Sequence, residues 1–456
     1  MKDTAKITFY GGTETVTGAN FLLEIDGKKI LIDCGLTQGL ELAEDTNWDP
    51  FLYDPKDIDI LFITHSHIDH IGKIPKLINE GFQGKIYSTK PTQALTLPML
   101  EDTAGILSKN KYFNLDKIYT EENIKKAFER WSSFDYHEVI SITPNLNVVL
   151  KDAGHILGSA MIEFIYSGKK IVFTGDLGNS PSPLLPDTEK ITDADYLIME
   201  SVYGDRNHES RNDRKSLLEK VIKDNYKRKG TLIMPTFSLE RSQELLFELD
   251  NLVENNRIPV MPIFFDSPLA IRLTEIFKQF RNYFNDGAQK AFSKDKYIFD
   301  FPGLHSTLHT KESQMINDAP NPKIIIAGSG MSSGGRIVHH EKHFLPDPNN
   351  TILLTGYQSL GTLGRQIEEG AKKIHISGEE VNVKAHVETI LGYSGHKDSD
   401  GLLQFVEDMK DKVKKVFVVM GEPKSAMFLA QKIKDNLGVN TLVPKEGDSI
   451  IINFTN

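Results

Sequence analysis

Three histidines and an aspartate crowd into a stretch of six residues that directly follows an apolar run at residues 58–64. They are His65, His67, Asp69 and His70. The chain turns where a strand ends, so side chains at alternating positions can converge there. His65 and His67 can then reach one cation, while Asp69 and His70 reach a second. Imidazole and carboxylate ligands without thiolates favour zinc, with manganese as the next choice, so the cluster predicts a metal site.

Two further segments each place one metal-ligand side chain on a glycine-containing loop after an apolar run. His155 follows residues 148–150, and Asp176 follows residues 171–173. The backbone bends easily at glycine, so both side chains can approach a shared site. Two metal ions bridged by a carboxylate and a hydroxide supply a nucleophile at neutral pH, because metal binding lowers the pKa of a bound water to about 7. This chemistry predicts a hydrolase.

The elements that must position these residues are mainly strands in the first part of the chain. Short apolar or alternating runs bounded by glycine-containing turns are typical of strands, and longer periodic segments are typical of helices. We predict strands at residues 7–10, 21–25, 29–33, 58–64, 160–166, 170–174 and 196–199, and helices at residues 72–79, 92–108 and 121–132.

The sequence pattern is different between about residue 203 and about residue 365, where segments typical of strands alternate with segments typical of helices. Such alternation is typical of a parallel sheet covered by helices. We predict strands at residues 231–235 and 259–265 and helices at residues 239–251 and 268–281, and residues 323–327 and 351–355 are further short apolar runs. A strand at residues 416–420 and a helix at residues 425–437 follow in the tail. This order predicts a domain inserted into another one, whose two halves flank the insert.

The composition is that of a soluble globular protein. Of the 456 residues, 39% are hydrophobic and 25% are charged, and no apolar run approaches the roughly 18 residues of a membrane span, so we expect no membrane partner. The net charge of −10 opposes unselective coating of nucleic acid but leaves room for a local cationic groove with metal ions. Cys34 is the single cysteine and the N-terminal residues contain no apolar signal segment, so we expect a cytoplasmic protein.

The segments with metal-ligand side chains resemble those of the metallo-β-lactamase superfamily. The resemblance rests on the sequence HSHIDH at residues 65–70, with Asp33 in LIDCG before it. It implies that Asp33 does not bind the metal itself but contacts the loop that carries the ligands. Such contacts orient the ligands and so adjust the affinity of the metal site. The implied ligands are His65, His67 and His155 for the first metal, Asp69 and His70 for the second, and Asp176 as a bridge between them.

Further segments resemble the β-CASP branch of this superfamily, whose members are nucleases. They are MESVYGDR at residues 199–206, GYSGH at residues 392–396, and glycine-rich stretches at residues 328–336 and 356–365 that look like the inserted domain of the branch. The similarity covers nearly the whole chain. It is closest to RNA-processing members related to the endonuclease subunit of the eukaryotic cleavage and polyadenylation factor.

The resemblance implies an α/β fold, namely an αββα metallo-β-lactamase sandwich with an inserted parallel-sheet domain. The first part of the sandwich is expected at residues 1–202 and the β-CASP domain at residues 203–370. The sandwich then resumes at residues 371–456, as an RNA-metabolising tail.

A histidine and a glutamate beside the metals complete the implied catalytic site. Phosphodiester hydrolysis needs a nucleophile, charge stabilisation and a proton for the departing oxygen. His396 is the candidate general acid, with Glu200 holding it protonated and oriented. Three arginines lie in loops that contain glycine or serine. A guanidinium group matches the geometry of a phosphate, so these arginines could bind the RNA backbone, and an internal salt bridge is an equally good interpretation of each. They are Arg241, Arg336 and Arg365.

One position departs from the family pattern. RNA-cleaving members carry a histidine ligand for the second metal directly before Gly-Glu, where this chain has Met420. A thioether suits neither zinc beside carboxylates nor manganese. The second metal then keeps Asp69, His70 and Asp176, and we expect it to bind more weakly. DNA-processing members of the branch also lack this histidine.

The first hypothesis is therefore a metal-dependent ribonuclease that acts on single-stranded RNA, with two zinc ions, or manganese, as cofactors. The alternatives are a DNA-directed nuclease of the same branch, a non-catalytic RNA-binding relative whose metal site has decayed, and a small-molecule hydrolase. The sequence leaves endonuclease and exonuclease action open, and likewise a monomer and a homodimer.

Overall fold

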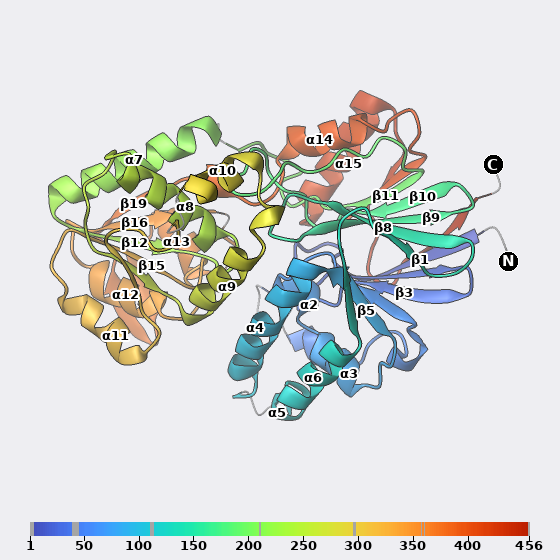
Figure 1. Ribbon diagram of the computed structural model, residues 1–456, viewed down its shortest axis with the longest axis horizontal. Helices are drawn as coiled ribbons and strands as arrows, with labels where there is room; N and C mark the ends of the chain where they lie inside the picture. Colours follow the sequence, from blue (N-terminus) through green and yellow to red (C-terminus); the bar gives the residue numbers. More distant parts are fainter. Residues whose placement is uncertain are drawn as a thin grey trace. The chain divides into compact units, whose positions relative to one another are not determined.

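The computed structural model of the protein describes residues 4–38, 45–109, 114–208, 211–294, 298–356, 358–359 and 361–454. The chain folds into two compact units (Figure 1). Unit 1 consists of Met1–Ser182, Pro186–Asn207 and His396–Asn456, and unit 2 of Pro183–Leu185 and His208–Gly395. Among the described residues, no helix combines the length and the apolar character that a bilayer crossing requires.

Unit 1 contains two sheets, each with seven strands in the described part of the chain. The order of the first sheet is β22 (Ser449–Asn453), β1 (Thr4–Gly11), β2 (Asn20–Ile25), β3 (Lys28–Ile32), β4 (Ile60–Phe62), β5 (Lys85–Thr89) and β6 (Trp131–Phe134). The order of the second is β21 (Thr441–Leu442), β20 (Lys415–Val418), β11 (Tyr196–Met199), β10 (Lys169–Phe173), β9 (Ala160–Tyr166), β8 (Leu146–Asp152) and β7 (Val139–Ser141).

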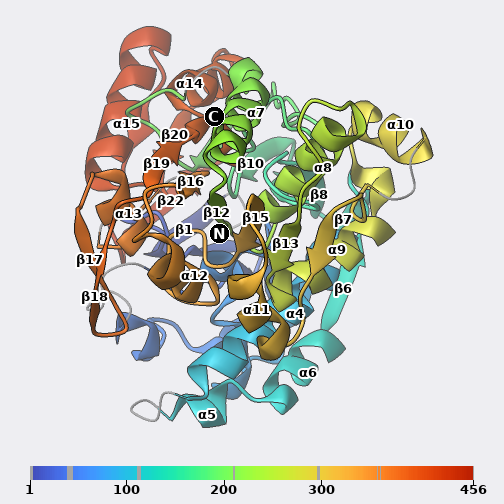
Figure 2. The ribbon, with the colours of Figure 1, turned by 90° about the vertical axis from the view of Figure 1, so that its left-hand side faces the viewer.

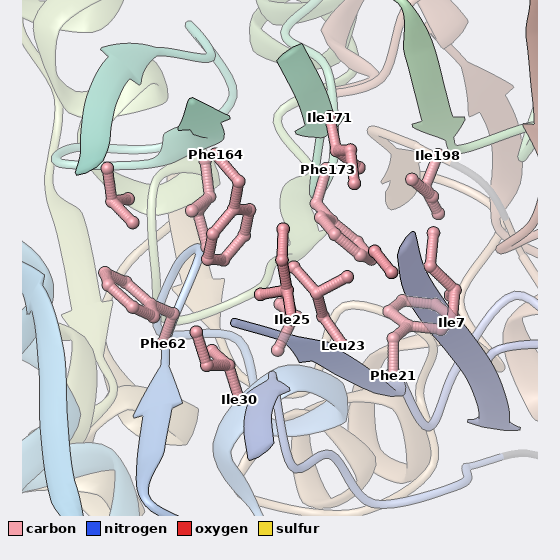
Figure 3. Close-up of a cluster of buried hydrophobic side chains, with 14 of the residues drawn as sticks. Ile7, Phe21, Leu23, Ile25, Ile30, Phe62, Phe164, Ile171, Phe173 and Ile198 are labelled. Carbon is pink, nitrogen blue, oxygen red and sulfur yellow. The ribbon is translucent and has the colours of Figure 1, made fainter. Parts of the chain in front are cut away.

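The inner faces of the two sheets share one apolar core, because every second residue of a strand points to the same side. Phe62 of β4 meets Phe164 of β9 with ring centres 5.6 Å apart, and Phe164 meets Phe173 of β10 at 5.8 Å. Figure 3 shows these rings reaching toward one another from strands of both sheets. This layer fixes the strand ends from which the candidate site residues project.

Helices cover the outer faces of both sheets of unit 1, which completes an αββα sandwich (Figure 1). Those of the first sheet are α2 (Ile68–Ile71), α3 (Ile74–Asn79), α4 (Lys90–Leu107), α5 (Leu115–Ile118) and α6 (Glu121–Glu129), and those of the second are α14 (Ser399–Glu407) and α15 (Pro423–Leu437). On the second sheet, Val172 and Leu197 face outward and pack with Leu402 and Leu429 of these helices.

Unit 2 is built on a sheet of six described strands, all parallel. Their order is β14 (Leu304–Ser306), β13 (Ile263–Asp266), β15 (Lys323–Ala327), β12 (Thr231–Pro235), β16 (Thr351–Leu354) and β19 (His386–Thr389). The central strands read as continuous apolar runs, as strands buried on both faces should. The prediction of an α/β sandwich combined with a parallel-sheet domain is confirmed.

Helices lie on both sides of the parallel sheet, with α8 and α9 on one side and α12 and α13 on the other (Figure 2). The helices of unit 2 are α7 (Arg211–Arg228), α8 (Arg241–Glu254), α9 (Pro268–Gln279), α10 (Asp286–Lys294), α11 (Thr310–Met315), α12 (Ile337–Phe344) and α13 (Leu363–Glu368). A separate hairpin joins β17 (Lys373–Ile376) and β18 (Glu379–Asn382). Short 3-10 turns are η1 (Thr46–Trp48), η2 (Pro55–Asp57), η3 (Arg281–Tyr283), η4 (Ile316–Asp318) and η5 (Leu391–Tyr393).

Several predicted elements differ from the structure at their ends, and two of these differences have an identifiable reason. The helix predicted at residues 121–132 ends at Glu129, because Trp131–Phe134 pairs with β5 as strand β6. The strand predicted at residues 259–265 begins only at Ile263. Pro262 precedes it and lacks the N–H group that a sheet ladder needs.

Candidate metal centre

The centre begins at Asp33, a carboxylate that is almost completely buried at the end of β3. Its Oδ1 accepts the backbone N–H of Thr64 at 2.8 Å, and its Oδ2 accepts the Thr64 hydroxyl at 2.7 Å. The same Oδ2 lies 2.7 Å from Nδ1 of His70. Asp33 therefore fixes the turn after β4 and holds the His70 ring so that Nε2 faces away from it.

Four side-chain atoms from three separate loops converge beside this turn. Nδ1 of His67 lies 3.1 Å from Nε2 of His65 and 3.2 Å from Nε2 of His155. Oδ2 of Asp176 lies 3.4 Å and 3.5 Å from the same two Nε2 atoms. Donor atoms about 2.05 Å from the centre of a tetrahedron are roughly 3.3 Å apart, the geometry that zinc prefers. These four distances are close to that value, and all four atoms lie within 4.8 Å of one another, so together they could hold one metal ion.

A second set of donors shares the Asp176 carboxylate. Nε2 of His70 lies 3.5 Å from Oδ2 of Asp176 and 3.9 Å from Oδ2 of Asp69. Nε2 of His70 and Oδ1 of Asp176 are both buried, and neither has a hydrogen-bond partner among the described residues. Buried polar atoms of this kind are costly unless something binds them. The donor set therefore fits a second cation bridged to the first through Asp176.

The electrostatics of the cluster keep the His67 imidazole neutral and the Asp176 carboxyl charged. Burial, together with the neighbouring imidazoles of His65 and His155, lowers the pKa of His67 well below its usual value. A neutral imidazole keeps a lone pair for a metal ion. Burial also opposes ionisation of Asp176, but the rings of His70 and His65 outweigh it and lower the pKa of that carboxyl well below its usual range.

A histidine–glutamate pair lies at the edge of the centre. Nδ1 of His396 is 3.2 Å from Oε1 of Glu200 and 4.0 Å from Oδ2 of Asp176. Glu200 is fully buried and accepts the backbone N–H groups of Leu177 at 2.6 Å and Val202 at 3.3 Å. Burial disfavours the charged His396 imidazole, but Glu200 outweighs burial and raises its pKa to about 9. His396 is 24% exposed, so a ligand can reach it.

Family profiles match three consecutive parts of the chain. Residues 15–228 match the metallo-beta-lactamase superfamily, residues 242–367 the Beta-Casp domain, and residues 380–444 the Zn-dependent metallo-hydrolase RNA specificity domain. Ribonuclease TTHA0252 of Thermus thermophilus is 35% identical over 93% of this chain and 95% of its own length. The chain belongs to the β-CASP branch of the metallo-β-lactamase superfamily.

Other relatives within this family carry different names. An RNase J-like protein of Methanocaldococcus jannaschii is 33% identical, over 97% of this chain and 98% of its own length. Transcription termination factor FttA of Methanosarcina mazei is 32% identical, over 96% of this chain and 70% of its own length. A solved structure of a protein of unknown function from Enterococcus faecalis V583 matches with a TM-score of 0.60 at 13% identity, covers 98% of this chain and 100% of its own, and shows the fold alone.

Met420, which stands where the resemblance to RNA-cleaving members implied a histidine ligand, is packed into the sandwich core of unit 1. Its side chain is 2% exposed and belongs to the apolar cluster between the sheets. Its N–H group donates to the carbonyl of Gly12 at 2.7 Å, and its carbonyl accepts the N–H of Ser201 at 3.1 Å. Met420 and His70 line the same internal cavity of about 10 Å³. The position therefore lies beside the second donor set, but with a thioether in place of an imidazole.

The three arginines predicted to bind phosphate all form ion pairs within unit 2. Arg241 pairs with Glu244, and Nη1 of Arg336 lies 2.6 Å from Oδ1 of Asp266. Nε of Arg365 lies 2.7 Å from Oε1 of Glu369. These contacts agree with the salt-bridge alternative, and a role toward phosphate stays a prediction. His340 of α12 also binds Asp266, with Nε2 2.7 Å from Oδ2, and His339 is exposed on the same helix.

Sequence reasoning missed several residues whose side chains contact Asp33 or the loops of the candidate ligands, namely Thr64, Thr188 and Lys397. Thr64 and Lys397 were available as immediate neighbours of His65 and His396. Thr188 had no signal at all, because it lies in an irregular segment far from the motifs. Such residues act through tertiary contacts that a local pattern does not encode.

We expect the purified protein to contain zinc or manganese and His67→Ala to lose most of it, because Nδ1 of His67 is at the centre of the first donor set. Elemental analysis after growth in metal-replete medium measures this directly. The matched control is His386→Ala, which removes an exposed imidazole of β19. Wild-type protein that carries no transition metal would contradict the assignment of the centre.

We also expect Met420→His to strengthen the second metal site by roughly ten-fold or more, because it adds an imidazole beside His70. Equilibrium dialysis against a graded chelator measures how many ions each chain retains. Met420→Leu, which preserves the packing without adding a ligand, is the control. If the histidine variant retains no more metal than the leucine variant, the cavity at Met420 is not part of the second site.

Proposed function

We propose that the protein is a zinc-dependent ribonuclease that hydrolyses phosphodiester bonds in single-stranded RNA. The observation that carries this proposal is the buried donor set with a histidine–glutamate pair at its edge, where Nδ1 of His396 lies 4.0 Å from Oδ2 of Asp176. The relatives named ribonuclease and RNase J-like support RNA as the substrate. The match of residues 380–444 to an RNA specificity domain supports it as well.

Two cation positions follow from the donor sets, and zinc fits the first of them best. The proposed ligands are His65, His67, His155 and Asp176 for the first ion, and Asp69, His70 and Asp176 for the second. Manganese is the alternative for a set without sulfur ligands. Divalent ions held by these residues would supply an activated water and would offset negative charge on the phosphate.

His396 is the proposed proton donor to the departing oxygen. Nδ1 of His396 is hydrogen-bonded to Oε1 of Glu200, and the hydrogen bonds that Glu200 accepts from two backbone N–H groups keep its carboxylate in place. The proton on Nε2 is then available to the substrate. The raised pKa of His396 keeps the imidazole protonated at neutral pH, so the acid is in the correct form before the bond breaks.

A DNA-directed nuclease of the same branch is the second candidate, and Met420 is the observation that favours it. A non-catalytic RNA-binding relative is the third, for the same reason. The complete first donor set supports catalysis over a decayed site. For the location of the protein we propose the cytoplasm, since the single cysteine, Cys34, is buried and without a disulfide.

The proposal is tested by incubating the metal-loaded protein with end-labelled single-stranded RNA and with DNA of matched sequence. Cleavage of the RNA, with product ends that report hydrolysis, is the expected result. Cleavage of the DNA alone would replace the first candidate with the second. Binding of RNA without any cleavage at full metal occupancy would favour the non-catalytic relative.

His396→Ala should reduce the turnover of RNA by at least about a hundred-fold, as the loss of a general acid does, while the metal content stays near that of the wild type. Glu200→Gln should reduce turnover as well, because a neutral amide no longer favours the charged imidazole. Single-turnover cleavage and elemental analysis of the same samples separate the two effects. Unchanged turnover in His396→Ala would assign the proton transfer to another group.

A further inference from the structure

Two loops that carry proposed metal ligands are tied together by a side chain outside the ligand set. The carbonyl of Ala153 precedes His155 by two residues, and the carbonyl of Gly178 follows Asp176 by two residues. The Thr188 hydroxyl oxygen lies 2.9 Å from the first carbonyl oxygen and 3.1 Å from the second. Thr188 therefore bridges the backbones of the His155 loop and the Asp176 loop.

Thr188 belongs to a bracing segment, residues 186–189, that is itself firmly attached to the end of β8. The N–H of Glu189 donates to the carbonyl of Asp152 at 3.0 Å, and the N–H of Asp152 donates to Oε1 of Glu189 at 3.1 Å. Nε2 of His137 lies 2.8 Å from the same carboxylate. These contacts hold the bracing segment at a fixed position next to the His155 loop.

Gly154 makes this close approach feasible. A Cβ atom at residue 154 would lie 2.7 Å from the backbone N of Thr188, and the glycine has a φ of +65°. A side chain would both collide with the bracing segment and strain the backbone. The N–H of Gly154 donates to Oδ1 of the buried Asp152 at 2.7 Å, which holds the turn from the other side.

The loop that carries His396 joins the same point through Lys397. Its Nζ donates to the Gly178 carbonyl at 2.9 Å, and its backbone N–H donates to the Leu177 carbonyl, also at 2.9 Å. The Gly178 carbonyl is therefore shared by Thr188 and Lys397. Three loops, with His155, Asp176 and His396, meet where these two side chains donate.

We propose that Thr188 and Lys397 are positioning residues that set the spacing between His155 and Asp176 and so determine the affinity of the first metal ion. This inference rests on the metal centre of the proposed function. The sandwich core fixes where the strands end, whereas the loops beyond them must hold donor atoms 3.5 Å apart. Partners outside the ligand set that orient ligands typically contribute 10- to 100-fold in metal affinity or activity.

The alternative is that Thr188 only braces its own segment and contributes to stability alone. The two roles differ in what they change. A brace affects the melting temperature of the metal-free protein, whereas a positioning residue affects the dissociation constant for zinc beyond any change in stability. Thr441 offers a matched control, because its hydroxyl also donates to a carbonyl, that of Ala430 at 3.1 Å, elsewhere in unit 1.

The test compares full-length Thr188→Val, Thr188→Ser and Thr441→Val with the wild type, by chelator competition with Zn²⁺ and by thermal unfolding of the metal-free proteins. Thr188→Val removes the hydroxyl and keeps the shape, so it should weaken zinc binding by about 10- to 100-fold. Thr188→Ser restores the hydroxyl and should stay within about three-fold of the wild type. Thr441→Val should leave zinc affinity unchanged.

Equal zinc affinity of Thr188→Val and Thr441→Val overturns the positioning role while leaving the metal centre intact. Failure of the wild type itself to bind Zn²⁺ overturns the proposed function, and the inference with it. Should Thr188→Val not fold, Lys397→Met decides, since it removes the other donor to the Gly178 carbonyl. Unaltered zinc affinity in that variant then overturns the inference.

Discussion

The hydrogen bonds accepted by Asp33 are the constraint on which the centre depends. One buried carboxylate takes the backbone N–H and the hydroxyl of Thr64 and lies 2.7 Å from Nδ1 of His70. These contacts fix the turn after β4 and the tautomer of one ring together, with Nε2 of His70 directed to Asp176. A ligand loop without this support would be free to rotate its imidazoles, and the donors would lose the spacing that a metal ion needs.

The αββα sandwich supplies the next level of support. The apolar core between the sheets fixes the ends of β4, β8 and β10, from which the loops of His65, His155 and Asp176 leave. Hydrophobic packing cannot place a loop atom to a few tenths of an ångström, because it is not directional. Directional contacts made by Asp33, Glu200 and the segment at residues 186–189 do this instead.

A feature of this protein could be predicted from the sequence when the residues that determine it are close together along the chain. The strand before His65 and the histidine spacing lie within a single short segment, so the fold class and the family could be predicted. Predicting that β13 begins only at Ile263 required the effect of Pro262 on a sheet ladder to be taken into account. Strand β6 forms where the end of a helix was expected, because pairing with β5 outweighs local propensity. The contact of Thr188 with Ala153 joins residues 35 positions apart, and no local pattern encodes such a pair.

The central claim is that buried imidazole and carboxylate groups, without sulfur, hold a metal ion in unit 1. X-ray absorption spectroscopy of the zinc-loaded protein tests it most directly, because the method reports the atoms that surround the metal. The account predicts a single shell of nitrogen and oxygen ligands at about 2.0–2.1 Å, with the scattering pattern of several imidazoles. A sulfur shell at about 2.3 Å, which would implicate Cys34 or Met420, or a spectrum without imidazole scattering, would contradict it.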